Sequence, residues 1–245
     1  MLKGKTALIT GAGTGIGRSI ALSLAAAGAD IAINYSRSEK EALETQKAVE
    51  ESGVRSLVYK ADVADDGQVR AMVRETIKKL GRLDILVNNA GVTYFVDHAD
   101  LEGLKEEYWD RIMGVNVKGM FFCCRAAAEE LKKRKGCILN ITSIAGLTGL
   151  GSSIAYAASK AAAISLTKSL ARAMAPEVRV NSIAPGVVLT RWVEGQEDHV
   201  QRLADGSPMG RIATAEDVSE VAFALITHAS FVTGQSIVVD GGMFI

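Results

Sequence analysis

Cysteine and histidine are scarce in this sequence, and their placement excludes several kinds of site. Three cysteines occur, at 123, 124 and 137, and none forms a Cys-x-x-Cys pair. They therefore provide neither a disulfide framework nor a paired-thiol metal site. The three histidines lie far apart in the chain, without the spacing typical of metal ligands. We expect no metal and a reducing compartment.

Long apolar runs and an excess of one charge are also lacking. No apolar run approaches the 18 residues of a membrane-spanning helix, and the first 11 residues, MLKGKTALITG, lack the apolar core of a signal peptide. Lys+Arg and Asp+Glu both number 28, and the basic tract 132–135 ends a predicted helix. We therefore expect a cytoplasmic protein that binds neither membrane nor nucleic acid.

Proline is rare as well, with three residues, and no linker, repeat or low-complexity segment is visible. What is present is a globular composition: 245 residues, 48% of them hydrophobic and 23% charged. Such a chain buries enough apolar surface to fold without disulfides or metals. We expect one domain over residues 1–245.

Short apolar runs alternate with helix-length amphipathic segments along the whole chain. Apolar strands separated by helices indicate a parallel sheet covered on both faces. Right-handed crossovers then give a doubly wound α/β fold, here a Rossmann-like sheet of seven strands. The predicted strands are 6–10, 31–35, 57–59, 85–88, 137–142, 178–184 and 236–240, and the predicted helices are 15–28, 38–52, 65–80, 106–133, 152–175 and 215–227.

A glycine-rich turn lies between the first predicted strand and the first predicted helix. Gly11, Gly15 and Gly17 stand in the segment TGAGTGIG. Glycine lets the backbone turn tightly and approach a pyrophosphate, which the unpaired N–H groups at the helix start attract. An ordinary turn would use the same residues, but the place between a strand and a helix favours dinucleotide binding.

The Thr-Gly-x-x-x-Gly-x-Gly spacing of this turn resembles the signature of the short-chain dehydrogenase/reductase family. Further family-like residues follow in the family's order, over about residues 4–242. The resemblance implies an NAD(P)-dependent oxidoreductase that interconverts an alcohol and a ketone. The other matches are Asp62-Val63, Asn88-Asn89-Ala90-Gly91, Asn116, Ser143, Tyr156 with Lys160, and Pro185-Gly186.

Four residues carry the predicted chemistry. Tyr156 and Lys160 are four residues apart in a predicted helix, and therefore lie on one face. A cation within about 4–6 Å lowers the pKa of a phenol, so Tyr156 is the expected general acid in reduction and base in oxidation. Ser143, at the end of the preceding strand, is placed to bind the substrate oxygen. The resemblance assigns Asn116 to a water relay that reaches Lys160.

Structural alternatives exist for Tyr156, Lys160 and Asp62. A tyrosine at a helix start often packs, and a lysine four residues later is often solvated. Asp62 equally suits a turn or a helix cap, although the resemblance implies a contact with adenine. The complete set of expected cofactor contacts is Gly11, Thr14, Gly15, Ile16, Gly17, Ser36, Arg37, Asp62, Val63, Asn89, Ala90, Gly91, Tyr156, Lys160, Pro185, Gly186, Val188 and Thr190.

The second predicted strand bears on the choice between NADP and NAD. An acidic residue about 20 positions past the glycine turn normally binds the ribose 2′-hydroxyl of NAD. Tyr35 stands there instead, and Ser36 and Arg37 suit a 2′-phosphate. Many NADP-preferring relatives also carry a basic residue where this chain has Thr14. We expect NADP, with NAD as the alternative.

The substrate is expected at loops 93–99 and 147–153 and at a substrate loop of about 187–212, where Trp192 and Met209 stand beside acidic residues such as Glu194. The chain resembles 3-oxoacyl-(acyl-carrier-protein) reductases and sugar-alcohol and steroid dehydrogenases about equally. A short connection at 175–181 departs from the carrier-protein reductases, although the basic tract 132–135 would suit an acidic carrier protein.

Other function classes stay open. A nucleotide-sugar epimerase would need a further domain, and a non-catalytic cofactor sensor would tend to lose the serine, tyrosine or lysine. Enoyl reductases of this fold space the tyrosine and lysine more widely.

Two features indicate a homotetramer. Helices 106–133 and 152–175 carry apolar or small residues around much of their surface, and the chain ends in the apolar residues Met243, Phe244 and Ile245. The family resemblance implies the same assembly. The alternative for the chain end is packing over its own substrate loop.

Overall fold

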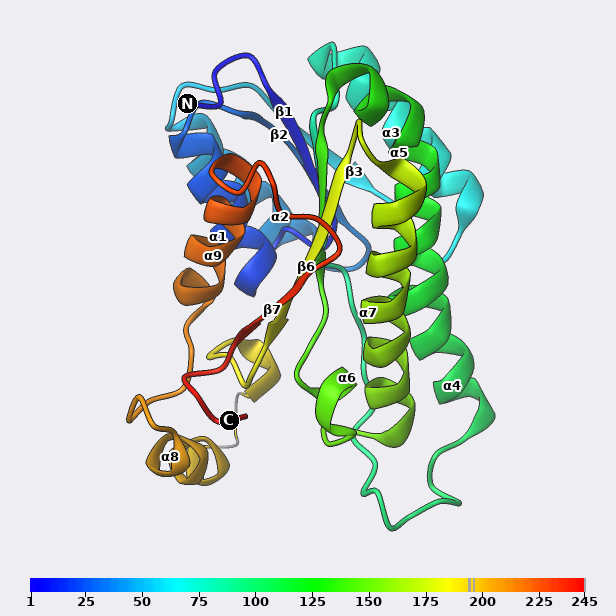
Figure 1. Ribbon diagram of the computed structural model, residues 1–245, viewed down its shortest axis with the longest axis vertical. Helices are drawn as coiled ribbons and strands as arrows, with labels where there is room; N and C mark the ends of the chain where they lie inside the picture. The colour runs from blue at the N-terminus through cyan, green and yellow to red at the C-terminus, as the bar shows by residue number, and fades with distance from the viewer. Residues whose placement is uncertain (194, 196, 245) are drawn as a thin grey trace.

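A seven-stranded sheet, entirely parallel, forms the centre of the computed structural model, which describes residues 1–193, 195 and 197–244 (Figure 1). The strand order is β3-β2-β1-β4-β5-β6-β7, so the order reverses between β1 and β4. This is the predicted doubly wound fold. The strands are β1 (Thr6–Ile9), β2 (Asp30–Tyr35), β3 (Ser56–Lys60), β4 (Ile85–Asn88), β5 (Cys137–Ile141), β6 (Arg179–Pro185) and β7 (Ser236–Val239).

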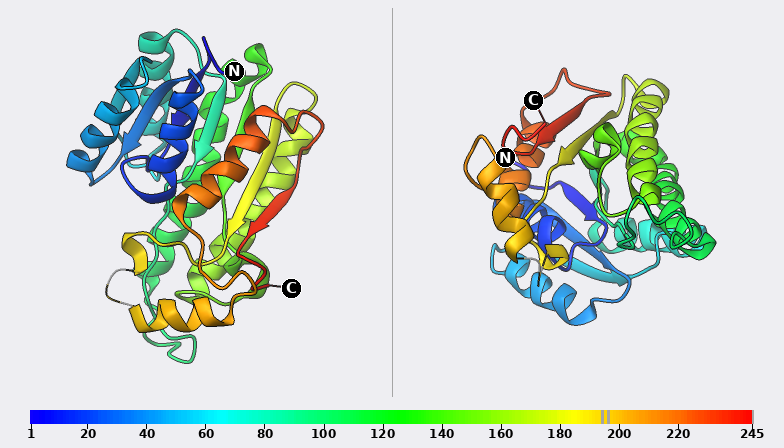
Figure 2. Two further views of the ribbon diagram at one scale, coloured as in Figure 1. Left: turned by 90° about the vertical axis from the view of Figure 1, so that its left-hand side faces the viewer. Right: turned by 90° about the horizontal axis from the view of Figure 1, so that it is seen from below.

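Helices cover both faces of the sheet (Figures 1 and 2). Strand residues alternate between the two faces, so Ile9 packs toward one layer and Leu8 toward the other. Both side chains are fully buried. One layer contains α1 (Gly15–Ala26), α2 (Glu39–Glu50) and α9 (Ala215–Thr227), and the other contains α3 (Asp66–Leu80), α4 (Glu106–Met113), α5 (Met120–Arg134) and α7 (Ile154–Met174).

Local sequence explains where these helices begin and end. Asp65 caps α3, because its carboxylate accepts the N–H of Gln68 at 3.0 Å, and Gly81 ends the helix with a left-handed backbone. Thr214 and Asp217 form a capping box at the start of α9.

The predicted helix 106–133 is not a regular α-helix. Between α4 and α5 lies a π-helical turn, η1 (Gly114–Gly119). A Cβ atom on Gly119 would lie 2.8 Å from the Val63 side chain, so glycine allows this segment to pack closely against the loop that follows β3. π-Turns within helices often occur at functional sites, and η1 carries Asn116.

The sequence did not predict three short helical elements. They are α6 (Ala145–Thr148), the 3₁₀ turn η2 (Arg191–Val193) and α8 (Glu197–Gly206), all next to the expected substrate site. Glu194 and Ile245, both named above, lie outside the described residues.

The three cysteines are buried free thiols. Burial raises the pKa of Cys137 to about 11 and that of Cys124 to about 12, so these thiols are protonated near neutral pH. In the part of the chain that the structure describes, no group of three or more His, Cys, Asp or Glu side chains is placed to hold a metal ion. None of the described helices is long and apolar enough to cross a membrane.

Candidate active site

The glycine turn joins β1 to α1 at the point where the strand order reverses. Asn89, just after β4, holds the turn by donating from Nδ2 to the carbonyls of Thr10 and Gly11, at 3.0 Å each. A Cβ atom on Gly17 would overlap that amide and lie 2.6 Å from the Gly11 carbonyl, so this position requires glycine.

The start of α1 is free to bind an anion. Thr14 occupies the N-cap position but makes no side-chain capping hydrogen bond. The first N–H groups of the helix therefore lack a side-chain acceptor, as a bound pyrophosphate would require. On these observations, the residues present fit the diphosphate of a dinucleotide.

The chain after β6 leads back to the same turn. Gly186 donates to the Val239 carbonyl at 2.9 Å, and Val188 pairs with Ala213. The methyl group of Thr190 consequently lies 3.2 Å from where a Cβ atom on Gly15 would stand. The structure thus brings the expected contacts at 185–190 to the glycine turn and to the end of β5, where Ile144 donates to the Pro185 carbonyl at 3.0 Å.

Tyr156 and Lys160 lie in the first two turns of α7, next to Ser143. Ser153 caps this helix and accepts the N–H of Tyr156 at 3.3 Å. The Lys160 ammonium donates to the Ile141 carbonyl at 2.9 Å and lies 5.5 Å from the centroid of the Tyr156 ring. The end of β5 and the start of α7 therefore hold the serine, tyrosine and lysine in one cluster.

Burial dominates the ionisation of this cluster. Desolvation raises the pKa of Tyr156 to about 12, and a hydrogen bond with the Ser143 hydroxyl acts in the opposite direction. Desolvation lowers the pKa of Lys160 to about 8. In the protein without its cofactor the pKa of Tyr156 is thus raised by burial, and a lowering by Lys160 together with a cationic nicotinamide ring stays a prediction.

Asn116 binds the segment that follows β4. Its Oδ1 accepts the N–H of Val92 at 2.9 Å, and its Nδ2 donates to the Val92 carbonyl and to Ser159 Oγ, both at 3.0 Å. Asn116 Oδ1 and Lys160 Nζ lie 3.6 and 3.8 Å from where a Cβ atom on Gly91 would stand. Asn116 therefore lies beside the catalytic cluster, and both N–H groups of its amide are used within the protein.

Asp62, an expected adenine contact, already has two protein partners. Its Oδ2 accepts from Arg111 at 2.7 Å, and its Oδ1 accepts the N–H of Ala64 at 3.0 Å. Partial burial acts to raise the pKa of Asp62, but these bonds and the charge of Arg37 hold it below its ordinary value. The carboxylate thus holds the turn after β3, the alternative role that the sequence offered, and also anchors α4 through Arg111, which the sequence did not indicate.

The end of β2 carries the residues that bear on cofactor choice. Ser36 and Arg37 are exposed, and the Tyr35 hydroxyl donates to Glu39 at 2.8 Å. Sequence reasoning missed a further guanidinium: Arg191 donates to Ser38 Oγ at 3.0 Å. Its one signal in the sequence is its place directly after Thr190, an expected cofactor contact.

The expected substrate loops meet beside Tyr156. Val96 donates to the Ser152 carbonyl at 2.9 Å, and the Trp192 ring lies edge-on to Tyr156 with the centroids 6.1 Å apart. Large exposed apolar side chains gather on these loops and on the chain end: Phe95, Leu147, Leu150, Leu189, Trp192, Met209 and Phe244.

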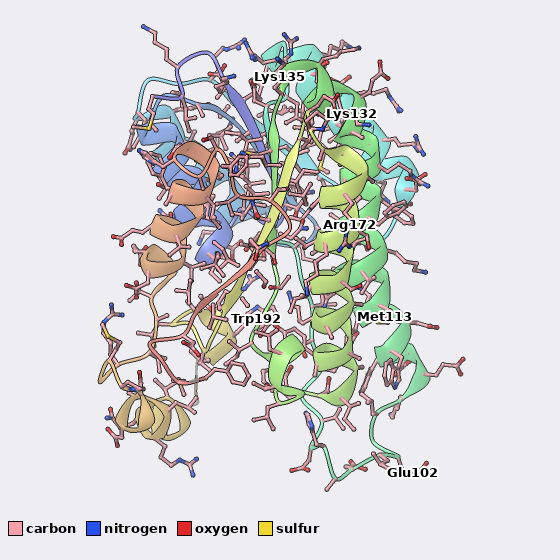
Figure 3. The ribbon with its side chains drawn as sticks, in the orientation of Figure 1. Glu102, Met113, Lys132, Lys135, Arg172 and Trp192 are labelled. Carbon is pink, nitrogen blue, oxygen red and sulfur yellow. The ribbon has the colours of Figure 1, made fainter. Side chains whose placement is uncertain are left out.

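The segment just before the chain end contacts the substrate loop, while Phe244 itself is 45% exposed. Met209 donates to the Gly241 carbonyl at 3.2 Å, and α8 and the C-terminus lie at the same end of the molecule (Figure 2). Lys132 and Lys135 lie at the opposite end from Trp192 (Figure 3). The basic tract is therefore remote from the substrate loops.

Comparison with known proteins agrees with this geometry. A family model described as enoyl-(acyl carrier protein) reductase matches residues 11–244. The chain is 39% identical over 244 residues to the 3-oxoacyl-[acyl-carrier-protein] reductase FabG of Staphylococcus aureus, covering 98% of each chain.

Among solved structures, a short chain dehydrogenase from Burkholderia cenocepacia in complex with NADP superposes with a TM-score of 0.91 at 35% identity, covering 99% of this chain and 98% of that one. Levodione reductase gives a TM-score of 0.92 at 30% identity, covering 99% and 98%. The chain belongs to the short-chain dehydrogenase/reductase family and is an oxidoreductase.

Proposed function

We propose that this protein is an NADPH-dependent carbonyl reductase, with residues 1–245 forming one domain and about 187–212 the substrate loop. The observation that carries the proposal is the cluster of Ser143, Tyr156 and Lys160 beside a glycine turn that fits a diphosphate. A nicotinamide cofactor supplies the hydride when bound. The protein's own residues then handle the substrate oxygen and its proton.

Ser143 and Tyr156 act together on the carbonyl oxygen. Both hydroxyls lie at the carboxyl end of β5, where the Ser143 hydroxyl donates a hydrogen bond to that oxygen and orients it. As the carbonyl carbon receives the hydride, the Tyr156 hydroxyl gives its proton to the carbonyl oxygen. In the oxidation direction the tyrosinate takes this proton back. The raised pKa of Tyr156 keeps it protonated for reduction.

Lys160 stabilises the tyrosinate that each reduction leaves. Its ammonium is held over the phenol ring by the Ile141 carbonyl and is buried, so that solvent screens its charge weakly. A positive nicotinamide ring would add to this effect. We propose that Lys160 also binds the nicotinamide ribose, and that Asn116 positions the 91–92 segment next to it and belongs to the relay that returns a proton.

The same proposal assigns NADP over NAD. In place of an acidic residue, the end of β2 offers Ser36, Arg37 and the hydroxyl of Ser38. A solved relative is titled as a complex with NADP, which agrees with this choice. Arg37→Ala is expected to weaken NADPH binding while leaving NADH binding unchanged, and equal NADPH binding by the two proteins would refute the role of Arg37.

The substrate is an apolar or amphipathic ketone, with 3-oxoacyl thioesters as one candidate, since the named relative in Staphylococcus aureus is a 3-oxoacyl-[acyl-carrier-protein] reductase. Sugar-alcohol and steroid dehydrogenation are alternatives. The apolar rim of Leu150, Trp192 and Met209 favours a substrate with little charge. Lys132 and Lys135 of the basic tract lie at the opposite end of the molecule from Trp192, so the tract does not border this rim (Figure 3).

The test is NADPH oxidation against a panel of ketones, sugars, steroid ketones and 3-oxoacyl thioesters, with Tyr156→Phe as the inactive control. Turnover by the wild type alone supports the proposal. Silence across the panel, despite NADPH binding, would overturn it and favour a cofactor sensor.

We also propose a homotetramer in the cytoplasm. Phe121 on α5 is 38% exposed to solvent, and so is Val238 on the sheet-edge strand β7. Such surfaces are suited to helix pairing and to edge contacts between subunits. Light scattering at micromolar concentration is expected to give about four times the chain mass of 25.9 kDa, and a mass near 26 kDa would refute the assembly.

A further inference from the structure

Arg191 crosses from the turn after β6 to the start of α2. Its Nη1 donates to Ser38 Oγ at 3.0 Å, although the two residues are 153 positions apart in the sequence. Ser38 is the N-cap residue of α2, yet its side chain makes no capping hydrogen bond to that helix. Its hydroxyl bonds to Arg191 instead.

The position of the Arg191 backbone is set by its neighbour Thr190. Thr190 packs against Gly15 of the glycine turn, with its methyl group 3.2 Å from where a Cβ atom on that glycine would stand. Arg191 therefore reaches from the diphosphate position toward the end of β2. In dinucleotide-binding folds the residues at the end of this second strand recognise the adenosine ribose and its 2′ substituent.

The region around Ser38 carries positive charge that could bind an anion. Arg37 is exposed and, among the described residues, forms no ion pair, and the carboxylate of Asp62 that its charge acts on is already paired with Arg111. Among the side chains that the structure describes, which exclude those of residues 194 and 196–199, no carboxylate lies within ion-pair distance of Arg191. The nearest acidic residue in sequence, Glu39, already accepts the Tyr35 hydroxyl. Arg191 bonds Ser38 through one guanidinium nitrogen, and Arg37 directly precedes Ser38 in the chain. Guanidinium groups bind phosphate through pairs of N–H bonds.

We propose that Arg191 is a second ligand for the ribose 2′-phosphate of NADP, acting with Arg37 and the hydroxyl of Ser38. This inference rests on the proposed function as an NADP-dependent enzyme. It also explains how Thr14 can stand where many NADP-preferring relatives have a basic residue, because Arg191 brings a positive charge to the end of β2 from the segment after β6.

The test measures binding rather than turnover. Isothermal titration compares adenosine 2′,5′-bisphosphate with 5′-AMP, which differ by the 2′-phosphate alone, and NADPH with NADH. The variants are Arg191→Ala and Arg191→Lys. Lys40→Ala is the matched control, because Lys40 is an exposed cation in the first turn of α2 that pairs with Glu44. Thermal unfolding checks that each variant is folded.

Arg191→Ala is expected to lower the preference for the 2′-phosphorylated ligands about tenfold or more, the usual value of a charge-assisted hydrogen bond. Arg191→Lys keeps part of the preference, and Lys40→Ala changes it less than about twofold. Raising the salt concentration reduces the preference more in the wild type than in Arg191→Ala.

Two contrary results are distinguishable. A wild type that prefers NADPH, with an Arg191→Ala variant whose preference stays within twofold of it, overturns the role of Arg191 alone. A wild type that binds NADPH no more tightly than NADH overturns the NADP assignment of the proposed function, and the role of Arg191 with it.

Discussion

The ammonium group of Lys160 lies over the ring of Tyr156, 5.5 Å from the ring centroid, and is held there by the Ile141 carbonyl. Lys160 is 5% exposed, so its charge has lost nearly all of its hydration. A buried ammonium with a single carbonyl partner among the described residues lowers the stability of the fold. Buried charges of this kind are typical of functional sites.

Lys160→Met is therefore expected to stabilise the protein while abolishing turnover. Burial lowers the pKa of Lys160 to about 8 from 10.5, so the unfolded chain binds more protons between these pH values. The wild type consequently gains stability as pH rises through this window, and the variant lacks that gain. Near pH 7 the variant is more stable by up to about 3 kcal/mol. Urea denaturation of both proteins from pH 7 to 10.5 measures the difference. A less stable variant with an unchanged pH dependence would contradict this account.

A second buried charge, Asp84, holds the opposite end of the sheet. Its carboxylate accepts from the N–H of Thr6 at 2.9 Å and from Arg82 at 2.6 and 2.7 Å, and pairs with Lys5. Burial alone would raise the pKa of Asp84, but these partners hold it below its ordinary value.

Asp84→Asn is expected to lower the free energy of unfolding by about 2–4 kcal/mol, because it leaves Arg82 without its charge partner. The carboxylate's contribution is complete above the ordinary pKa and is lost as pH falls through the lowered folded-state value. Acid therefore destabilises the wild type more steeply than the variant. Denaturation curves from pH 3 to 7 test this, with Glu44→Gln in an exposed pair as a control expected to cost less than about 0.5 kcal/mol. Equal effects of the two substitutions would refute the role of Asp84.

Sequence pattern located the sheet and the glycine turn because both depend on local chemistry. Strand β4 was predicted with its observed bounds, Ile85–Asn88, because a short apolar run that ends at asparagine is typical of a buried strand. The serine, tyrosine and lysine could be placed together because Ser143 ends a strand and the other two share a helix face.

Contacts between distant segments were not visible in the sequence. The bond from Arg191 to Ser38 and the ion pair of Arg111 with Asp62 depend on how loops fold over the sheet edge. The π-turn at Gly114–Gly119 could not be predicted, because it shifts the helical pattern of apolar residues by only one position. The raised pKa of Tyr156 follows from burial, which a motif does not report.

Trp192 is expected to shape the substrate site through its contact with Tyr156. The two rings meet edge to face, with the centroids 6.1 Å apart, and 39% of the Trp192 side chain stays exposed. An aromatic contact of this kind contributes about 0.5–1.5 kcal/mol. Trp192→Ala should therefore raise KM for an apolar ketone about two- to tenfold with little change in kcat, while Trp192→Phe keeps KM close to the wild type. Steady-state kinetics on the best substrate of the panel decides this. A fall in kcat at constant KM would instead mean that Trp192 orients Tyr156.

The most direct test of the central claim is the Tyr156→Phe variant, which removes one oxygen and leaves the ring packing in place. Turnover is measured with NADPH and the best ketone under conditions where chemistry limits the rate, and NADPH binding is measured by titration. The account predicts a fall in kcat of about 10²–10⁴-fold with binding nearly unchanged, because the general acid is lost and the cofactor groove is intact. A variant that keeps more than about a tenth of the wild-type kcat would contradict the assignment of Tyr156 as the proton donor.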